Sequence, residues 1–113
     1  MKHTKLTLVI VASFALLACV LPSIETRHAM WIQNNEALVG ADFFQTYWGR
    51  VQMSGSGVFH GAKQLPNGNT ESKFGNNNKN CTHFFEYEPS TGKIIKFRYE
   101  TNGQEKYVCY QII

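Results

Sequence analysis

The chain has 113 residues, of which 43% are hydrophobic, and a formal net charge of +3 at pH 7. This length accommodates one domain. Removing residues 1–18, which we expect to be cleaved, leaves 95 of the 113 residues, and losing Lys2 and Lys5 lowers the net charge from +3 to +1. A near-neutral chain without a basic run argues against nucleic-acid binding, because phosphate contacts need clustered positive charge.

The first segment has the pattern of a signal peptide. Lys2 and Lys5 precede a charge-free run over residues 6–18, which is too short to span a bilayer as a helix. The run ends in Leu-Leu-Ala-Cys at residues 16–19, which resembles a bacterial lipobox, although a smaller residue than Leu17 is commoner there. We therefore expect a signal peptide over residues 1–18 and lipid on Cys19. The alternative is an ordinary secretory peptide, cut after Ala18 or near Ser23.

The cysteines support a cell-envelope location. If Cys19 carries lipid, Cys81 and Cys109 remain as one pair in an oxidising compartment, and we expect them to form a disulfide. The disulfide would close a loop of about 28 residues, and in the chain-entropy model a loop of that length stabilises a small domain by about 3–4 kcal/mol. The rival interpretation, two thiols that bind a metal, lacks a Cys-x-x-Cys spacing or nearby histidine pairs.

Residues 19–30 show no periodicity, and we interpret them as a lipidated tether to a single α+β domain over residues 31–113. Residues 31–38 are expected to form a helix that Gly40 ends. Asp42 is the expected N-cap of a second helix over residues 43–48, stopped by Gly49. The alternative is one helix over residues 35–48.

Several aromatic residues fall in this helical region. We expect Phe44, Tyr47 and Trp48 to pack mainly on the apolar face of a sheet. Aromatic side chains are also enriched in binding interfaces, so Trp31, Tyr47 and Trp48 are our candidate partner surface.

The rest of the domain is expected to be a small antiparallel sheet of three to five strands. Strand patterns cover residues 58–65 and 70–74, with an Asn-Gly turn between them. A longer hairpin over residues 81–100 turns at Pro-Ser-Thr-Gly. Its alternating pattern places one set of residues on an apolar face: Cys81, His83, Phe85, Tyr87, Ile95, Phe97 and Tyr99.

The expected path of the C-terminal segment, residues 106–113, depends on the disulfide. Phe85 must pair with Ile95 or Phe97, since a slip of one residue would place it opposite Lys96. Cys81 then lies near Tyr99 or Thr101. If residues 106–113 formed a regular third strand of this meander, Cys109 would lie two strand spacings from Cys81, about 9.6 Å, too far for a disulfide. We therefore expect this segment to leave the sheet or to bend.

A family resemblance covers most of residues 31–100. A lipobox, a helix ending in glycine and an aromatic hairpin resemble small outer-membrane lipoproteins of the SmpA/OmlA (BamE-like) type. The matching segments are residues 16–19, 39–40, 47–49 and 84–95. Two departures are Val51, where the family has proline, and a shorter segment between Gly40 and Gly49. The resemblance implies an α+β fold and a scaffold role in outer-membrane protein assembly. The absence of Asp at Val20, again by resemblance, favours the outer membrane.

No established catalytic motif occurs in the sequence. His60 and His83 would form a metal pair only if their strands met, and we interpret them as ordinary strand histidines. Glu86 and Glu88 are a carboxylate pair with acid–base potential, but Lys96 and Arg98 are natural cross-strand partners for such charges. Cys81 has no base near it in the sequence. We expect no enzyme activity, no metal and no cofactor.

The sequence therefore predicts a lipid-anchored envelope protein that acts by protein–protein binding, as a scaffold or accessory subunit of an outer-membrane or secretion assembly. Its expected location is the outer membrane, facing the periplasm, with secretion as the alternative. The expected partners are the membrane, through the lipid on Cys19, and an unknown envelope protein. Two alternative functions stay open: an exclusion or immunity-type lipoprotein against phage, plasmid or toxin, and a small secreted enzyme or enzyme inhibitor.

Overall fold

The computed structural model describes residues 21–75, 81–101 and 109. In chain order, its elements are α2 (Ile24–Glu36), the 3-10 helix η1 (Phe43–Gln45), α3 (Tyr47–Ser54), β1 (Phe59–Gln64), β2 (Thr70–Gly75), β3 (Cys81–Tyr87) and β4 (Ile94–Thr101). No helix within these ranges is both long enough and apolar enough to cross a membrane. The predicted signal peptide and Cys19 lie outside the described residues.

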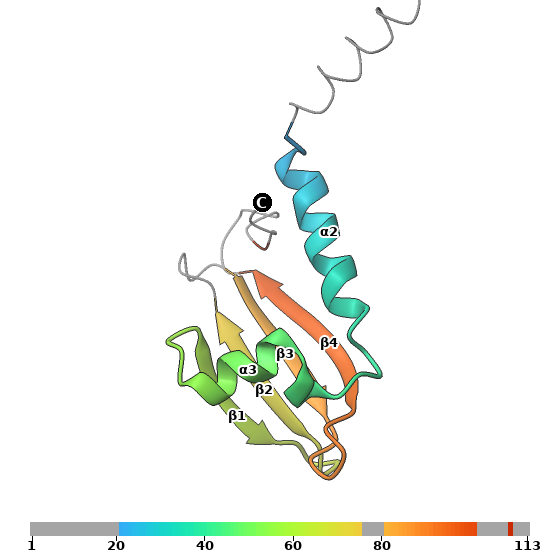
Figure 1. Ribbon diagram of the computed structural model, residues 1–113, viewed down its shortest axis with the longest axis vertical. Coiled ribbons are helices and arrows are strands. Elements are labelled where there is room, and N and C mark those ends of the chain that lie inside the picture. Colours follow the sequence, from blue (N-terminus) through green and yellow to red (C-terminus); the bar gives the residue numbers. More distant parts are fainter. Residues whose placement is uncertain (1–20, 76–80, 102–108, 110–113) are drawn as a thin grey trace, which may run out of the picture.

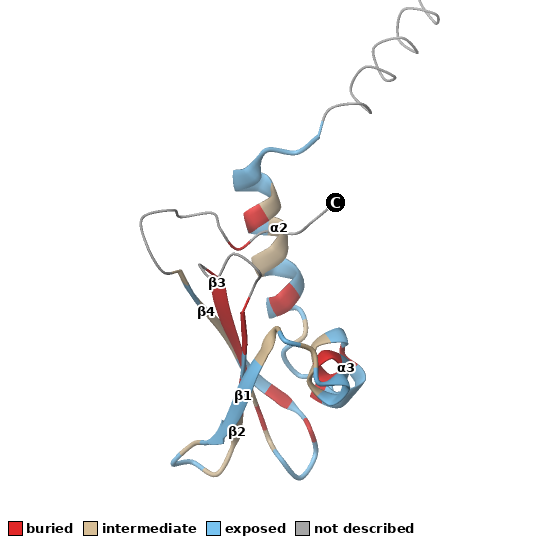
Figure 2. Cartoon of the chain, turned by 90° about the vertical axis from the view of Figure 1, so that its left-hand side faces the viewer, coloured by how far each residue is buried: buried red, intermediate tan, exposed pale blue. Residues whose placement is uncertain are grey.

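The four strands form one antiparallel sheet in the order β1-β2-β3-β4. Both helices lie on the same side of this sheet (Figures 1 and 2). We call that side the covered face and the other side the open face. The predicted α+β architecture, with short helices on a small antiparallel sheet and one disulfide, is confirmed.

Helix α2 begins seven residues earlier than predicted, inside the segment that we interpreted as a tether. Ser23 is its N-cap, and the Ser23 side chain accepts a hydrogen bond from the Thr26 N–H at 3.2 Å. His28, Trp31 and Asn35 follow at helical spacing and are buried or half-buried. Because two of these three residues are polar, a pattern of apolar residues at helical spacing does not reveal this face of the helix.

The second helix also differs from both predictions. Asp42 caps only the short η1, and a second cap, Thr46, starts α3 by accepting a hydrogen bond from the Gly49 N–H at 3.2 Å. Gly49 therefore lies inside α3 and does not stop it. A side chain at Gly49 would collide with the backbone carbonyl of Phe43, so its role is close packing. The helix ends instead at Gly55, which has a φ of 72°.

The hairpin of β3 and β4 has one of the predicted registers. Phe85 pairs with Phe97 and Cys81 pairs with Thr101. An irregularity beside Tyr87 then shifts the register, so that Tyr87 pairs with Ile94. Ile94 is consequently in the core at 1% exposure, whereas Ile95 is 41% exposed. The prediction that Ile95 faces the core was wrong, because the bulge reverses the alternation.

The core on the covered face has two parts. The larger one lies under η1 and α3 and consists of Phe43, Val51, Phe74, Phe85, Tyr87 and Ile94. The smaller one lies beside α2 and consists of the two cysteines with Trp31 and Tyr99 packed against them.

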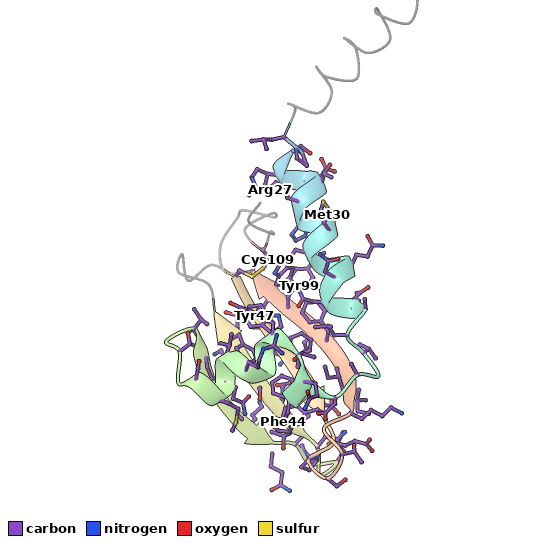
Figure 3. The ribbon with its side chains drawn as sticks, viewed as in Figure 1. Arg27, Met30, Phe44, Tyr47, Tyr99 and Cys109 are labelled. Atoms are coloured by element: carbon purple, nitrogen blue, oxygen red, sulfur yellow. A yellow bond between two sulfur atoms is a disulfide. The ribbon has the colours of Figure 1, made fainter. Side chains whose placement is uncertain are left out.

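The predicted disulfide is present. Cys81 and Cys109 are joined, with their Cα atoms 5.2 Å apart and a sequence separation of 28. Cys109 is buried and lies beside α2 (Figure 3). Whether residues 106–113 form a strand lies outside the described residues, apart from Cys109 itself, which is in a bend.

Candidate functional site

Of the three aromatic residues in the predicted partner surface, Trp31 serves mainly to hold α2 on the sheet. Its ring meets those of His83, Phe97 and Tyr99 edge-on, with centroid separations of 5.4, 5.5 and 5.6 Å. Such contacts contribute packing energy beyond the buried area alone. Trp31 is half-buried, and we assign it to the internal packing of the domain.

Trp48 links the two helices. Its indole N–H donates a 3.0 Å hydrogen bond to the side-chain oxygen of Asn35, and the Asn35 amide donates to the Trp31 carbonyl at 2.8 Å. The Trp48 ring also packs on His83 and Phe74, at 4.2 and 5.1 Å between centroids. Since both its polar and its apolar parts have internal partners, Trp48 offers a partner protein little of its surface.

Tyr47 is different, because most of its side chain is exposed. Its exposure is 63%, and among the described residues its ring contacts that of Trp48, at 5.1 Å between centroids. Phe44 is 40% exposed, and its ring also packs edge-on against Tyr87 of the sheet, as predicted, at 5.4 Å between centroids. Phe43 is fully buried and stacks on the same Tyr87 at 4.4 Å. We call Phe44 and Tyr47 the exposed aromatic pair; both lie along the η1–α3 segment (Figure 3).

Two caps fix the backbone that carries this pair. Asp42 accepts a hydrogen bond from the Phe44 N–H at 3.1 Å. The Thr46 hydroxyl accepts from the Gly49 N–H and donates to the Phe43 carbonyl at 2.6 Å. The pair therefore stands on a segment that is anchored immediately before and between its two members. A sequence signal for this turn exists, namely two N-cap residues four positions apart.

The loop after α2 bonds to the start of β4, through the Gly40 N–H to the Ile94 carbonyl and the Ile94 N–H to the Ala41 carbonyl, both at 2.8 Å. Val39 and Ile95, which are next to these residues in the sequence, are 46% and 41% exposed.

His83 lies beneath the two tryptophans and is only 3% exposed. Its Nε2 atom has no hydrogen-bond partner among the described residues. Burial without a counter-charge lowers its pKa from 6.5 to about 3, so the ring is neutral at physiological pH. His60 lies on the open face, where its ring covers Gly75, while His83 lies on the covered face. The two histidines therefore do not form a metal pair.

The open face carries charged residues around Phe84. The Arg98 guanidinium lies 3.7 Å from the centre of the Phe84 ring and forms two hydrogen bonds to Glu71, at 3.0 and 3.2 Å. These bonds raise the Arg98 pKa. A shallow hollow of about 420 Å³ borders this cluster. Arg98 and Glu71 thus neutralise each other, and the predicted pairing of Arg98 with Glu86 or Glu88 is replaced by pairing with Glu71 and Glu100.

Glu86, the other candidate for acid–base chemistry, has a structural role. It accepts hydrogen bonds from Asn69 at 2.8 Å and from Asn67 at 3.0 Å, which fasten the β1–β2 turn. These bonds keep the pKa of the Glu86 carboxyl below its usual range. Among residues 21–75, 81–101 and 109, no group of three His, Cys, Asp or Glu side chains is arranged to hold a metal.

Searches of protein-family models, of curated proteins and of solved structures returned no match to this chain.

Proposed function

We propose that this protein is a lipid-anchored cell-envelope protein that acts by binding another envelope protein, as a scaffold or accessory subunit of an outer-membrane or secretion assembly. Two separate features support the proposal: the N-terminal sequence supports the anchor, and the exposed aromatic pair supports the binding.

The anchor is supported by the charge-free run that ends in Leu-Leu-Ala-Cys at residues 16–19. The Cys81–Cys109 disulfide is consistent with it, because disulfides persist in oxidising compartments such as the periplasm. Metabolic labelling with an alkyne fatty acid should mark the wild-type chain and leave Cys19→Ala unmarked. Label that persists in Cys19→Ala would contradict lipidation at this residue.

The observation that carries the binding function is the exposure of Phe44 and Tyr47 on a capped, well-packed segment. Aromatic residues are enriched in interfaces, where they bury a large area at a small cost in conformational entropy. Tyrosine adds a hydroxyl that can hydrogen-bond at the rim. A surface of this kind suits a hydrophobic recess on a partner protein better than it suits a small charged ligand.

The test is site-specific photocrosslinking in intact cells. A photoreactive phenylalanine analogue at Tyr47 should give a discrete crosslinked band, and Phe44→Asp in the same chain should remove it. Met53 provides a matched control, because it is an apolar residue of α3, the helix that carries Tyr47, and is 75% exposed. Met53→Asp should leave the band intact. If both substitutions weaken crosslinking equally, the exposed aromatic pair is not the partner-binding surface.

A further inference from the structure

Only a short piece of chain separates the candidate lipid site from the folded domain. Three residues, Val20, Leu21 and Pro22, lie between Cys19 and Ser23, the N-cap of α2. An extended chain spans at most about 3.6 Å per residue, so the Cα atoms of Cys19 and Ser23 are at most about 14 Å apart. Because α2 begins inside the expected tether, the first turn of the domain stays close to any lipid on Cys19.

Two exposed side chains at this end are apolar. Leu21 is 74% exposed and Ile24 is 44% exposed. Apolar side chains at the start of an exposed helix gain by leaving water for the interfacial region of a bilayer. Their sequence position, two and five residues after Cys19, brings them within reach of the membrane surface to which the lipid would attach.

Helix α2 is attached to the sheet, so its orientation determines that of the domain. Trp31 packs on Phe97 and Tyr99, and the His28 ring makes a hydrogen bond to the Cys109 carbonyl. The N-terminus of α2 and the disulfide lie toward one end of the domain, and the β1–β2 and β3–β4 hairpin turns lie at the opposite end (Figure 1).

We infer that the N-terminal end of α2, with Leu21 and Ile24, rests on the lipid bilayer surface and that the two hairpin turns point away from it. This inference depends on the lipidation of Cys19 proposed above. The 13 residues of α2 span about 20 Å at 1.5 Å per residue. An upright α2 therefore holds the η1–α3 segment, with its exposed aromatic pair, about 20 Å farther from the bilayer than Ser23.

Three exposed positions along α2 provide a scale of distances for the test. Glu25, Ala29 and Gln33 are exposed and lie four residues apart, so they follow one face of the helix in steps of about 6 Å. Single cysteines at these positions, and at Ser90 in the distal β3–β4 turn, take a fluorescent label, because Cys81 and Cys109 are joined and Cys19 carries lipid. Lipidated full-length protein is reconstituted in phosphatidylethanolamine–phosphatidylglycerol vesicles that contain a doxyl-labelled lipid, which quenches nearby fluorophores.

The expected result is a gradient. Quenching should be strongest at Glu25→Cys, fall at Ala29→Cys and again at Gln33→Cys, and be absent at Ser90→Cys. Equal quenching at the three helix positions would mean that α2 lies flat, and stronger quenching at Ser90→Cys would mean that the domain is inverted. Either result, with lipid on Cys19 verified by intact mass, overturns the orientation while the proposed anchor stands. A chain without lipid on Cys19 overturns both.

A second pair of variants tests the apolar contact. Leu21→Asp combined with Ile24→Asp should reduce quenching of the label at Glu25→Cys at least twofold, because two charged groups resist entry into the interface. Met53→Asp removes an equally exposed apolar side chain at the end of α3 and should leave quenching unchanged. Unchanged quenching in the Leu21→Asp, Ile24→Asp chain would show that these side chains do not contact lipid.

Discussion

At one end of the covered face, η1 and α3 close over the larger apolar cluster, which includes Phe43, Phe74 and Phe85. At the other end, α2 lies over the disulfide, and its own buried residues are His28 and Asn35. His83 lies between the two ends, against Trp31 of α2 and Trp48 of α3. Both ends belong to one sheet, but the first is stabilised by apolar burial and the second by a covalent cross-link together with polar and ring contacts.

The difference follows from how much apolar surface each helix supplies. In α2, the buried side chains are His28 and Asn35, with Trp31 half-buried between them. Such a helix gains less from the hydrophobic effect than η1, whose Phe43 is fully buried. Small domains with limited cores are commonly supplemented by disulfides. The cross-link thus stands where the apolar core is weakest.

The largest effect should come from the apolar end. Phe43→Ala removes a fully buried ring stacked on Tyr87 and should lower the free energy of unfolding by about 3–5 kcal/mol. Phe44→Ala, one residue along, is the matched comparison and should cost less, about 1–2 kcal/mol, since its side chain is 40% exposed although its ring contacts Phe43 and Tyr87. Urea denaturation at pH 7.5 measures both. Equal losses would mean that the core does not centre on Phe43.

The second largest effect should come from the end of the domain that the disulfide cross-links. Replacing both Cys81 and Cys109 by alanine should cost about 3–4 kcal/mol for a loop of 28 residues. The loss should be uneven. Amide hydrogens of α2 should exchange faster under native conditions, while those of α3 should keep more of their protection, because α2 lies beside the disulfide and α3 covers the larger apolar cluster. If α2 and α3 lose protection together, the domain unfolds as one unit and the comparison between its ends fails.

Strands and turns were the most predictable part of this fold. All four strands lie where alternation and turn residues indicated, and the pairing of Phe85 with Phe97 is one of two registers allowed by the position of Lys96. The disulfide followed from the small number of cysteines. What alternation could not reveal was the bulge beside Tyr87, since the backbone irregularity that places Ile94 in the core has no signature in the apolar pattern.

Helix boundaries were less predictable because polar residues define them here. The start of α2 depends on the Ser23 cap, and its buried face includes His28 and Asn35, which an apolar period does not detect. The turn from η1 to α3 depends on Thr46, and it places Phe43 in the core beside the partly exposed Phe44. Of the three residues in the candidate partner surface, Tyr47 is exposed, whereas Trp31 and Trp48 are engaged within the domain.

The smallest expected effect is a dependence of the unfolding free energy on pH. His83 is buried without a counter-charge, and its pKa falls from 6.5 to about 3 in the folded state. Below pH 6.5 the unfolded chain therefore binds a proton at His83 that the folded chain does not bind, and stability falls as the pH falls toward 3. Between pH 7.5 and pH 5, this residue alone should cost about 2 kcal/mol of unfolding free energy.

The comparison of variants isolates this effect from the titration of carboxyl groups. His83→Phe should remove about 2 kcal/mol of the loss between pH 7.5 and pH 5, because phenylalanine cannot take up a proton in the unfolded chain. At pH 7.5 it should be as stable as wild type or more so, since the unpaired Nε2 is gone. His60→Gln changes an exposed histidine and should retain the wild-type pH dependence. If His83→Phe keeps the full loss at pH 5, proton uptake at other groups destabilises the domain, and its acid sensitivity does not come from His83.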